Sequence, residues 1–505
     1  MATTSRRQLL QLALAQGMGP VLVRHARAAD LPRFALGVAS GQPQPNGLVL
    51  WTRLTGEHLP PEVAVDWELA EDDAFRLVVA RGSETATPAD AHSVHAEVKG
   101  LRPERWYWYR FTALGQRSGV GRTRTAPAAD AEMHELELAI ASGQRYDQGH
   151  YAAWRHAAAE RLDLVLFLGD YIYEAGSPPD ALRSHAGGRI HDLEGYRQRY
   201  AQYKSDPALQ AAHAACPWLV IWDDHEVAND YAGWQGQRLE PDFAALRTAG
   251  YQAWWEHMPL PKAMRPVAGR ARIHQRLDWG RLARIQLLDA RQYRDPQACP
   301  KPGRGGSNTV RRHACPALAD PARSMLGAEQ ERWLAEGWAL DRTWNLLAQT
   351  TLMARCSLTD TAQGGTYWTD GWDGYAANRQ RLLAGVAERR VPGAVVLSGD
   401  VHANYVADLK VDFDDPRAPV VASEFCGTSI SSQGAPQARL DRLRGYNPHL
   451  HWARSDQRGY VQLRIARESL VAQLQVVQDV RDPQSPVGTA AEFAVAAQRP
   501  GVRVA

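Results

Sequence analysis

The feature that most constrains this fold is an apolar run that ends abruptly in Gly169 and Asp170. Six of the seven residues from Leu162 to Leu168 are apolar, a pattern typical of a strand buried on both faces of a parallel sheet. The glycine allows a tight turn, so Asp170 leaves the strand at its carboxyl end, where open α/β sheets bind ligands. The sequence therefore predicts an α/β core with a polar site at this strand end.

Two further apolar runs end in the same way. A single Asp after a strand most often caps a helix or opens a turn, but three such strands predict one shared cluster. Clustered carboxylates repel one another and need cations; oxygen ligands favour Ca²⁺ or Mg²⁺, while imidazole and phenolate admit iron, zinc or manganese. The groups are Asp170 on the first strand, Asp223, Asp224 and His225 on the second, and Asp400 and His402 on the third.

The N-terminus resembles an export signal. Residues 5–10, Ser-Arg-Arg-Gln-Leu-Leu, resemble the twin-arginine motif, and a weakly apolar segment leads to an A-x-A cleavage pattern at residues 26–28. A basic amphipathic helix is the alternative interpretation. We predict that residues 1–28 are a signal peptide that engages the twin-arginine export machinery, which would place the protein in the periplasm or outside the cell.

Length, charge and hydropathy narrow the possible partners. The 505 residues allow two or three domains, and no apolar run is long enough to span a bilayer, so we predict no transmembrane segment. Residues 1–28 contain four arginines and no acidic residue, and their removal turns 58 basic against 56 acidic residues into a slight acidic excess. This balance does not indicate nucleic-acid-specific binding.

The chain divides into an all-β part and an α/β part. Short strand-like runs with turns predict a sandwich of the fibronectin type III or immunoglobulin kind over residues 34–127, either a binding or a positioning module. Residues 135–505 alternate strand and helix patterns, with helices predicted at 149–161 and 195–215 and closing strands from residue 459. Cys299 and Cys315 flank a glycine-rich loop and form the best disulfide candidate in an oxidising compartment.

Taken together, the motifs resemble those of the metallophosphoesterases and, in detail, the PhoD-like alkaline phosphatase family. The resemblance implies an α/β metallophosphoesterase core of layered mixed sheets flanked by helices, with an N-terminal β-sandwich, and it covers nearly the whole mature chain. The family also includes phosphodiesterases and iron-dependent phospholipases D. The motifs are ASGQRY (141–146), LFLGDYIYE (166–174), YRQRYAQYKSDPALQAAH (196–213), WDDHEVANDYAG (222–233), LLDARQYRD (287–295), MLGAEQERWL (325–334), WDGY (372–375), SGDVHANY (398–405) and EFCGTSISS (424–432).

The resemblance implies Fe³⁺ and Ca²⁺ as cofactors and a set of residues that hold them. For two of these residues a structural role is the alternative: Tyr173 as a packed aromatic side chain and His402 as a core histidine. The implied ligands are Asp170, which bridges the metal ions, Tyr173 as a phenolate ligand to iron, Asp224 at a second metal position, Asn229 on the same loop, and Asp400 and His402, which complete the set.

The resemblance also implies two residues that act on the substrate. His225 would lie close to the phosphoryl group, unless it only makes a structural hydrogen bond. Arg291 is a candidate phosphate contact because a guanidinium fork matches phosphate geometry. A salt bridge from Arg291 to Asp289 or Asp295 is the alternative.

One position departs from the family pattern. Where the family has Ala-Ser-Cys-Gln, with the cysteine as a thiolate ligand to iron, this chain has Gly143. Three interpretations remain open. The remaining ligands and water hold iron, or a different ion such as Ca²⁺, Mn²⁺ or Zn²⁺ takes the site, or the chain binds phosphate without catalysis.

The predicted function is an exported metal-dependent phosphatase that hydrolyses phosphate monoesters, diesters or both by metal-activated water. One alternative is a phospholipase D-like phosphodiesterase, for which Trp368, Trp372 and Tyr375 would supply an aromatic cage for choline. The other is a non-catalytic phosphate- or envelope-binding protein with a degraded metal site.

Overall fold

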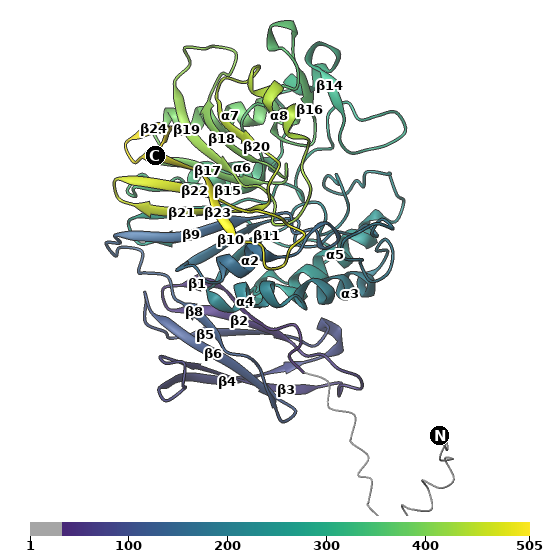
Figure 1. The fold of residues 1–505 in the computed structure, drawn as a ribbon, viewed down its shortest axis with the longest axis vertical. Coiled ribbons are helices and arrows are strands. Elements are labelled where there is room, and N and C mark those ends of the chain that lie inside the picture. The colour runs from purple at the N-terminus through teal and green to yellow at the C-terminus, as the bar shows by residue number, and fades with distance from the viewer. Residues whose placement is uncertain (1–32) are drawn as a thin grey trace, which may run out of the picture.

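The described part of the chain is built in layers, with two sheets packed face to face and helices on the outer side of each (Figure 1). The computed structural model describes residues 33–505, so the predicted signal peptide lies outside the described residues. The main hydrophobic core joins both sheets and the helices below the larger one, and a second core lies under the helices of the smaller sheet. The predicted architecture is confirmed.

The larger sheet has ten strands in the described chain and carries the first two site motifs. Its three central strands pair in parallel, as the buried apolar runs predict. Along the sheet the strands are β24 (Arg499–Val504), β23 (Val487–Ala496), β22 (Ser469–Val477), β21 (Gly459–Ala466), β9 (Glu135–Ala141), β10 (Leu164–Leu168), β11 (Trp218–Ile221), β1 (Val38–Gln44), β2 (Gly47–Arg53) and β5 (Ser93–Lys99).

The smaller sheet has seven strands in the described chain and carries the third motif after one of its parallel strands. Along the sheet they are β12 (Gln275–Trp279), β13 (Ala283–Leu287), β15 (Trp344–Thr351), β17 (Ala394–Gly399), β19 (Val420–Cys426), β18 (Asn404–Lys410) and β20 (Leu450–Arg454). A two-stranded ribbon is formed by β14 (Thr309–Arg311) and β16 (Thr366–Trp368).

Helices cover the outer face of each sheet. Those against the larger sheet are α2 (Ala152–Ala157), α3 (Leu193–Lys204), α4 (Pro207–Ala215) and α5 (Phe243–His257), and those against the smaller sheet are α6 (Gly327–Glu336), α7 (Ala376–Glu388) and α8 (Gln437–Arg444). The single helix predicted over 195–215 is two helices, because Pro207 cannot continue α3 and the Asp206 side chain caps α4. The helix predicted over 149–161 is shorter than expected.

The N-terminal sandwich is continuous with the larger sheet. Its outer sheet packs on β1, β2 and β5, and β1 pairs in parallel with β11 through Gly41 and Trp218. Only glycine fits at residue 41, because a Cβ there would lie 2.5 Å from the Pro259 carbonyl oxygen. The outer strands are β3 (Val63–Ala70), β4 (Val78–Ala86), β6 (Trp106–Ala113), β7 (Gln116–Arg117) and β8 (Gly121–Arg124).

Two smaller predictions are also settled. Cys299 and Cys315 form a disulfide, with their Cα atoms 6.1 Å apart. The closing strands expected from residue 459 are present as β21 to β24. Over residues 33–505, every helix is too short or too polar to cross a bilayer.

Candidate metal centre

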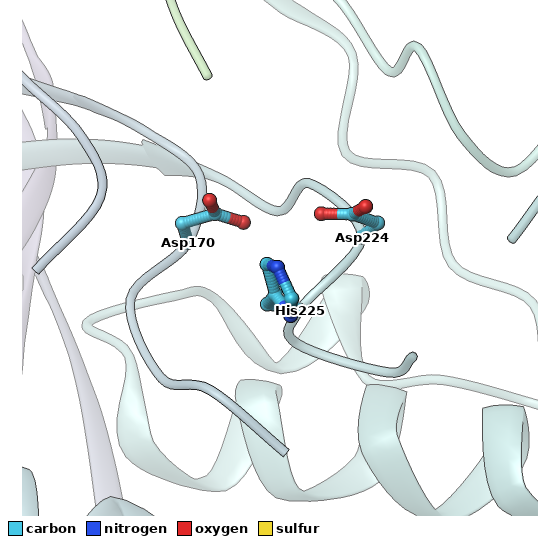
Figure 2. A group of neighbouring side chains, drawn as sticks. All are labelled: Asp170, Asp224 and His225. Carbon is cyan, nitrogen blue, oxygen red and sulfur yellow. The ribbon is translucent and has the colours of Figure 1, made fainter. Parts of the chain in front are cut away.

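The loops that follow β10, β11 and β17 bring the predicted carboxylates together. Atoms of Asp170, Asp224 and His225 that are able to ligate a metal lie within 4.8 Å of one another, and the same holds for Asp170, Asp223 and Asp400. Figure 2 shows the carboxylates of Asp170 and Asp224 facing each other from separate loops, with the His225 ring between and below them. The shared cluster expected from the sequence therefore exists, but it is built from strand ends of two packed sheets and not from one edge of a single sheet.

The backbone at this edge is tightly turned. Asp170 and Asp400 both have positive φ, 59° and 63°, conformations that Asp tolerates better than most residues. Gly169 is required between β10 and Asp170, because a Cβ there would lie 2.5 Å from the Asp223 Cβ. This close approach of two loops holds Asp170 against Asp223.

Tyr173 and His402 lie on one side of Asp170. The Tyr173 hydroxyl donates to Asp170 Oδ2 at 2.8 Å and lies 3.0 Å from His402 Nε2. His402 Nε2 is 3.7 Å from the same carboxylate oxygen, while Nδ1 lies 3.0 Å from the Gln433 carbonyl oxygen. That carbonyl fixes the ring so that Nε2 is left to ligate a cation.

The carboxylates present oxygens that lack partners within the protein. One buried oxygen of each of Asp170, Asp223, Asp224 and Asp400 accepts no hydrogen bond from the described residues. Burial, together with the neighbouring carboxylates, raises the pKa values of Asp170 and Asp400 well above their ordinary range. Buried oxygens without partners are costly, and a cation ligated by several of them would remove that cost. The donor set therefore fits metal ions with oxygen-rich coordination.

Two glutamates that the sequence analysis missed hold these groups in place. Glu226 is fully buried and accepts the backbone N–H groups of Asp170, Tyr171 and Asp223 at 3.2, 2.6 and 2.8 Å. Glu174 Oε2 lies 2.7 Å from His225 Nδ1. Both glutamates stand inside the quoted motifs, but their spacing carries no signal that separates them from the ligands.

His225 is enclosed by negative charge. Burial alone would lower its pKa, but Asp224, Glu174 and Asp170 raise the pKa of the imidazole well above its ordinary value. Although burial opposes it, the contact with His225 is the main cause that lowers the pKa of Glu174 to about 2. With Nδ1 bound to Glu174, Nε2 is left for a substrate or a metal ion.

Arg291 is fully buried and is paired with carboxylates other than those expected. Its Nε lies 2.5 Å from Asp223 Oδ1, and its Nη2 lies 2.8 Å from Asp370 Oδ2 and 3.6 Å from Asp224 Oδ2. The alternative of a salt bridge to Asp289 or Asp295 is wrong in its partners, and Asp370 was not foreseen. Contact of Arg291 with a phosphate group stays a prediction.

Asn229 lies on the loop that follows the second motif. Its backbone N–H donates to Glu174 Oε1 at 3.1 Å. This contact ties the loop to the carboxylate that also holds His225. Ligation of a metal by the Asn229 side chain stays a prediction.

Gly143 faces the ligand cluster. Its φ is 61°, and a Cβ built on it would lie 3.3 Å from His402 Nε2 but only 2.8 Å from the Ser429 Cβ. A side chain at this position would therefore enter the space beside His402 and Tyr173, at the cost of backbone strain and a displaced serine.

We predict that Gly143→Cys raises the iron content of the purified protein, because it adds a thiolate beside Tyr173 and His402. Gly143→Ala is the matched control, since it carries the same Cβ strain without sulfur. Elemental mass spectrometry and the visible absorption of an iron–phenolate pair would measure the gain. Equal iron in the two variants would show that residue 143 does not reach the metal.

Known proteins resemble this chain over nearly its whole length. A family model described as PhoD-like phosphatase matches residues 138–474, and the model of the N-terminal domain of the same family matches residues 21–127. The chain is 40% identical to alkaline phosphatase D of Bacillus subtilis (strain 168), over 98% of this chain and 86% of that protein. A solved structure titled "Structure of PhoD" aligns with a TM-score of 0.89 and 38% identity, over 94% of this chain and 92% of the other.

Proposed function

Because this chain belongs to the PhoD-like phosphatase family and is thus a phosphoric ester hydrolase, we propose that it is an exported, metal-dependent phosphatase that hydrolyses phosphate monoesters, diesters or both. The observation that carries the metal dependence is the set of four buried carboxylate oxygens without protein partners around Asp170. Such a set is costly as long as the carboxylates are charged, and bound cations would remove that cost.

The proposed metal ligands are those that meet around Asp170. Tyr173 and His402 suit iron, whereas Asp170, Asp224, Asn229 and Asp400 suit calcium, and zinc or manganese would also accept this mixed set. Metal ions bound here would neutralise phosphoryl oxygens and lower the pKa of water to near neutrality.

The protein's own residues would orient the ester and supply a proton. Glu174 holds His225 through Nδ1 at 2.7 Å, so the Nε2–H is free to be donated to the oxygen of the departing alcohol. Glu226 fixes the loops of Asp170 and Asp223 relative to each other, so the carboxylates that would hold the metal ions keep a fixed spacing.

A choline-selective phospholipase is the less favoured alternative. The aromatic cage expected for it is not formed, because Trp372 and Tyr375 are buried in the core of the smaller sheet. Their polar atoms are used internally: the Trp372 indole donates to Gln349, and the Tyr375 hydroxyl donates to the Asp295 carbonyl oxygen. A non-catalytic binding protein with a degraded metal site is also less favoured, because buried carboxylates without partners would lower its stability and would serve no function.

Export by the twin-arginine route, to the periplasm or the medium, is the proposed fate of the chain. It rests on residues 5–10 and 26–28, which lie outside the described residues. This route also suits a protein whose proposed metal ligands lie on loops of two different sheets, because such a site requires the folded core.

The test is an activity panel on the protein purified after export. We expect hydrolysis of p-nitrophenyl phosphate and of bis(p-nitrophenyl) phosphate, loss of both activities after chelation, and recovery with ferric and calcium ions. Phosphatidylcholine cleaved faster than both would favour the phospholipase. If no ester were cleaved with any of iron, calcium, zinc or manganese, the phosphatase proposal would be rejected.

A further inference from the structure

Three arginines near the metal centre differ in how far the fold itself uses their guanidinium groups. Arg291 is fully buried among aspartates. Arg458 is also buried, and its guanidinium donates to the Ser429 hydroxyl and to the carbonyl oxygens of His402, Ser432 and Ser455. Both guanidiniums are buried and already paired within the fold, so a more exposed guanidinium is better placed to receive an incoming anion.

Arg145 differs because it is held on one edge only. Its Nε and Nη2 donate to the two carboxylate oxygens of Asp147, at 2.7 and 3.4 Å. The Asp147 side chain is fully buried, whereas 22% of the Arg145 side chain is exposed. Among the residues described, none accepts a hydrogen bond from Nη1, so this outer edge of the fork faces solvent.

The position of Arg145 relative to the metal ligands is fixed by two contacts. Its guanidinium carbon lies 5.3 Å from the centre of the Tyr173 ring, whose hydroxyl meets Asp170 and His402. Its backbone N–H donates to Ser432 Oγ, which lies 2.7 Å from the Tyr173 hydroxyl. The side chains of His225 and His402 are also partly exposed, at 15% and 21%, so the centre that Arg145 adjoins reaches solvent.

We infer that the outer edge of Arg145 binds the non-bridging oxygens of the substrate phosphoryl group and makes the site prefer dianionic phosphomonoesters over monoanionic diesters. This inference rests on the proposed phosphatase function and assigns its substrate class. A monoester carries up to one negative charge more than a diester above pH 6, since its second pKa is about 6. A fixed guanidinium edge therefore gains more from the monoester.

The experiment compares Arg145→Gln and Arg145→Lys with Arg481→Gln in the metal-loaded enzyme. Arg481 forms the same kind of pair with an aspartate two residues away, Asp479, but on an exposed loop. For Arg145→Gln we expect the KM for p-nitrophenyl phosphate and the inhibition constant of inorganic phosphate to rise about 30-fold, with kcat changed less than about 3-fold.

The preference between substrates is the sharper measurement. In Arg145→Gln the kcat/KM ratio of monoester to bis(p-nitrophenyl) phosphate should fall about 10-fold, and Arg145→Lys should recover part of it because the charge is kept. Unchanged phosphate inhibition and an unchanged ratio in a variant with normal metal content would overturn the inference. If the wild-type enzyme cleaved neither ester, the proposed function would fail, and calorimetric titration with inorganic phosphate would still decide whether Arg145 binds the anion.

Discussion

Asp170→Asn is expected to remove most of the bound metal and to lower kcat/KM for p-nitrophenyl phosphate by about 10³-fold or more. Asp170 belongs to two groups of potential ligands, with Asp224 and His225 on one side and Asp223 and Asp400 on the other. Asparagine keeps the shape and tolerates the positive φ of 59°, but it loses the charge. Elemental analysis and steady-state kinetics on the same preparation measure the two losses together.

Asp170→Asn should, in contrast, increase the stability of the metal-free protein. Burial raises the pKa of Asp170, and repulsion from Asp224, Asp223 and Glu226 adds to the rise although attraction to His225 opposes it, so a neutral amide should relieve about 1–3 kcal/mol in the chelated protein. Asp66→Asn, at an exposed position of β3, is the control that should change neither property. A variant that kept stoichiometric metal, or that lost activity only by unfolding, would contradict the assignment of Asp170 as the bridging ligand.

His225→Gln should slow the enzyme according to how basic the leaving alcohol is. If Nε2 donates the proton, an alkyl phosphomonoester should lose about 10³-fold in kcat, whereas p-nitrophenyl phosphate, whose leaving group departs without protonation, should lose about 10-fold or less. Rates across a series of aryl and alkyl phosphates would measure this as a steeper dependence on the pKa of the leaving group.

Glu174→Gln and His134→Gln are the companion variants. Glu174→Gln keeps a hydrogen-bond acceptor for His225 but removes a charge that raises the pKa of the imidazole. It should therefore also slow alkyl esters more than p-nitrophenyl phosphate, but with smaller losses in kcat than His225→Gln. His134 is exposed and should show no effect. Equal losses for all leaving groups in His225→Gln would mean that the imidazole binds metal or charge and does not donate the proton.

The sequence determined the parts of this protein that follow from local pattern. The run from Leu164 to Leu168 is apolar at every position and is followed by glycine, which is enough to predict a buried parallel strand with Asp170 at its carboxyl end. The same logic placed Asp224 beside Asp170, because carboxyl ends of parallel strands in one sheet share one edge, whereas Asp400 joins them only because the smaller sheet packs against the larger one. Cys299 and Cys315 were found because only a short loop separates them.

The tertiary structure decided which groups around those ligands touch. Glu174 and Glu226 are ordinary acidic residues in the sequence, and only the approach of two loops at Gly169 turns them into the groups that hold His225 and the Asp170 loop. The helix predicted over 195–215 is divided at Pro207, because the Asp206 cap begins a new helix there. Hydrophobic periods of 2 and 3.6 residues predict which face of a strand or helix a residue occupies. They do not predict which residue of a distant segment it will contact.

The same limit separates the two arginines. Arg291 and Arg145 each stand in a motif with neighbouring acidic residues, and both would suit a phosphate group by chemistry alone. Only the fold shows that Arg291 is enclosed by Asp223 and Asp370, whereas Arg145 keeps one edge in solvent. Burial is a property of the packed sheets rather than of the local sequence, and burial is what decides whether a charge serves the fold or remains available for a substrate.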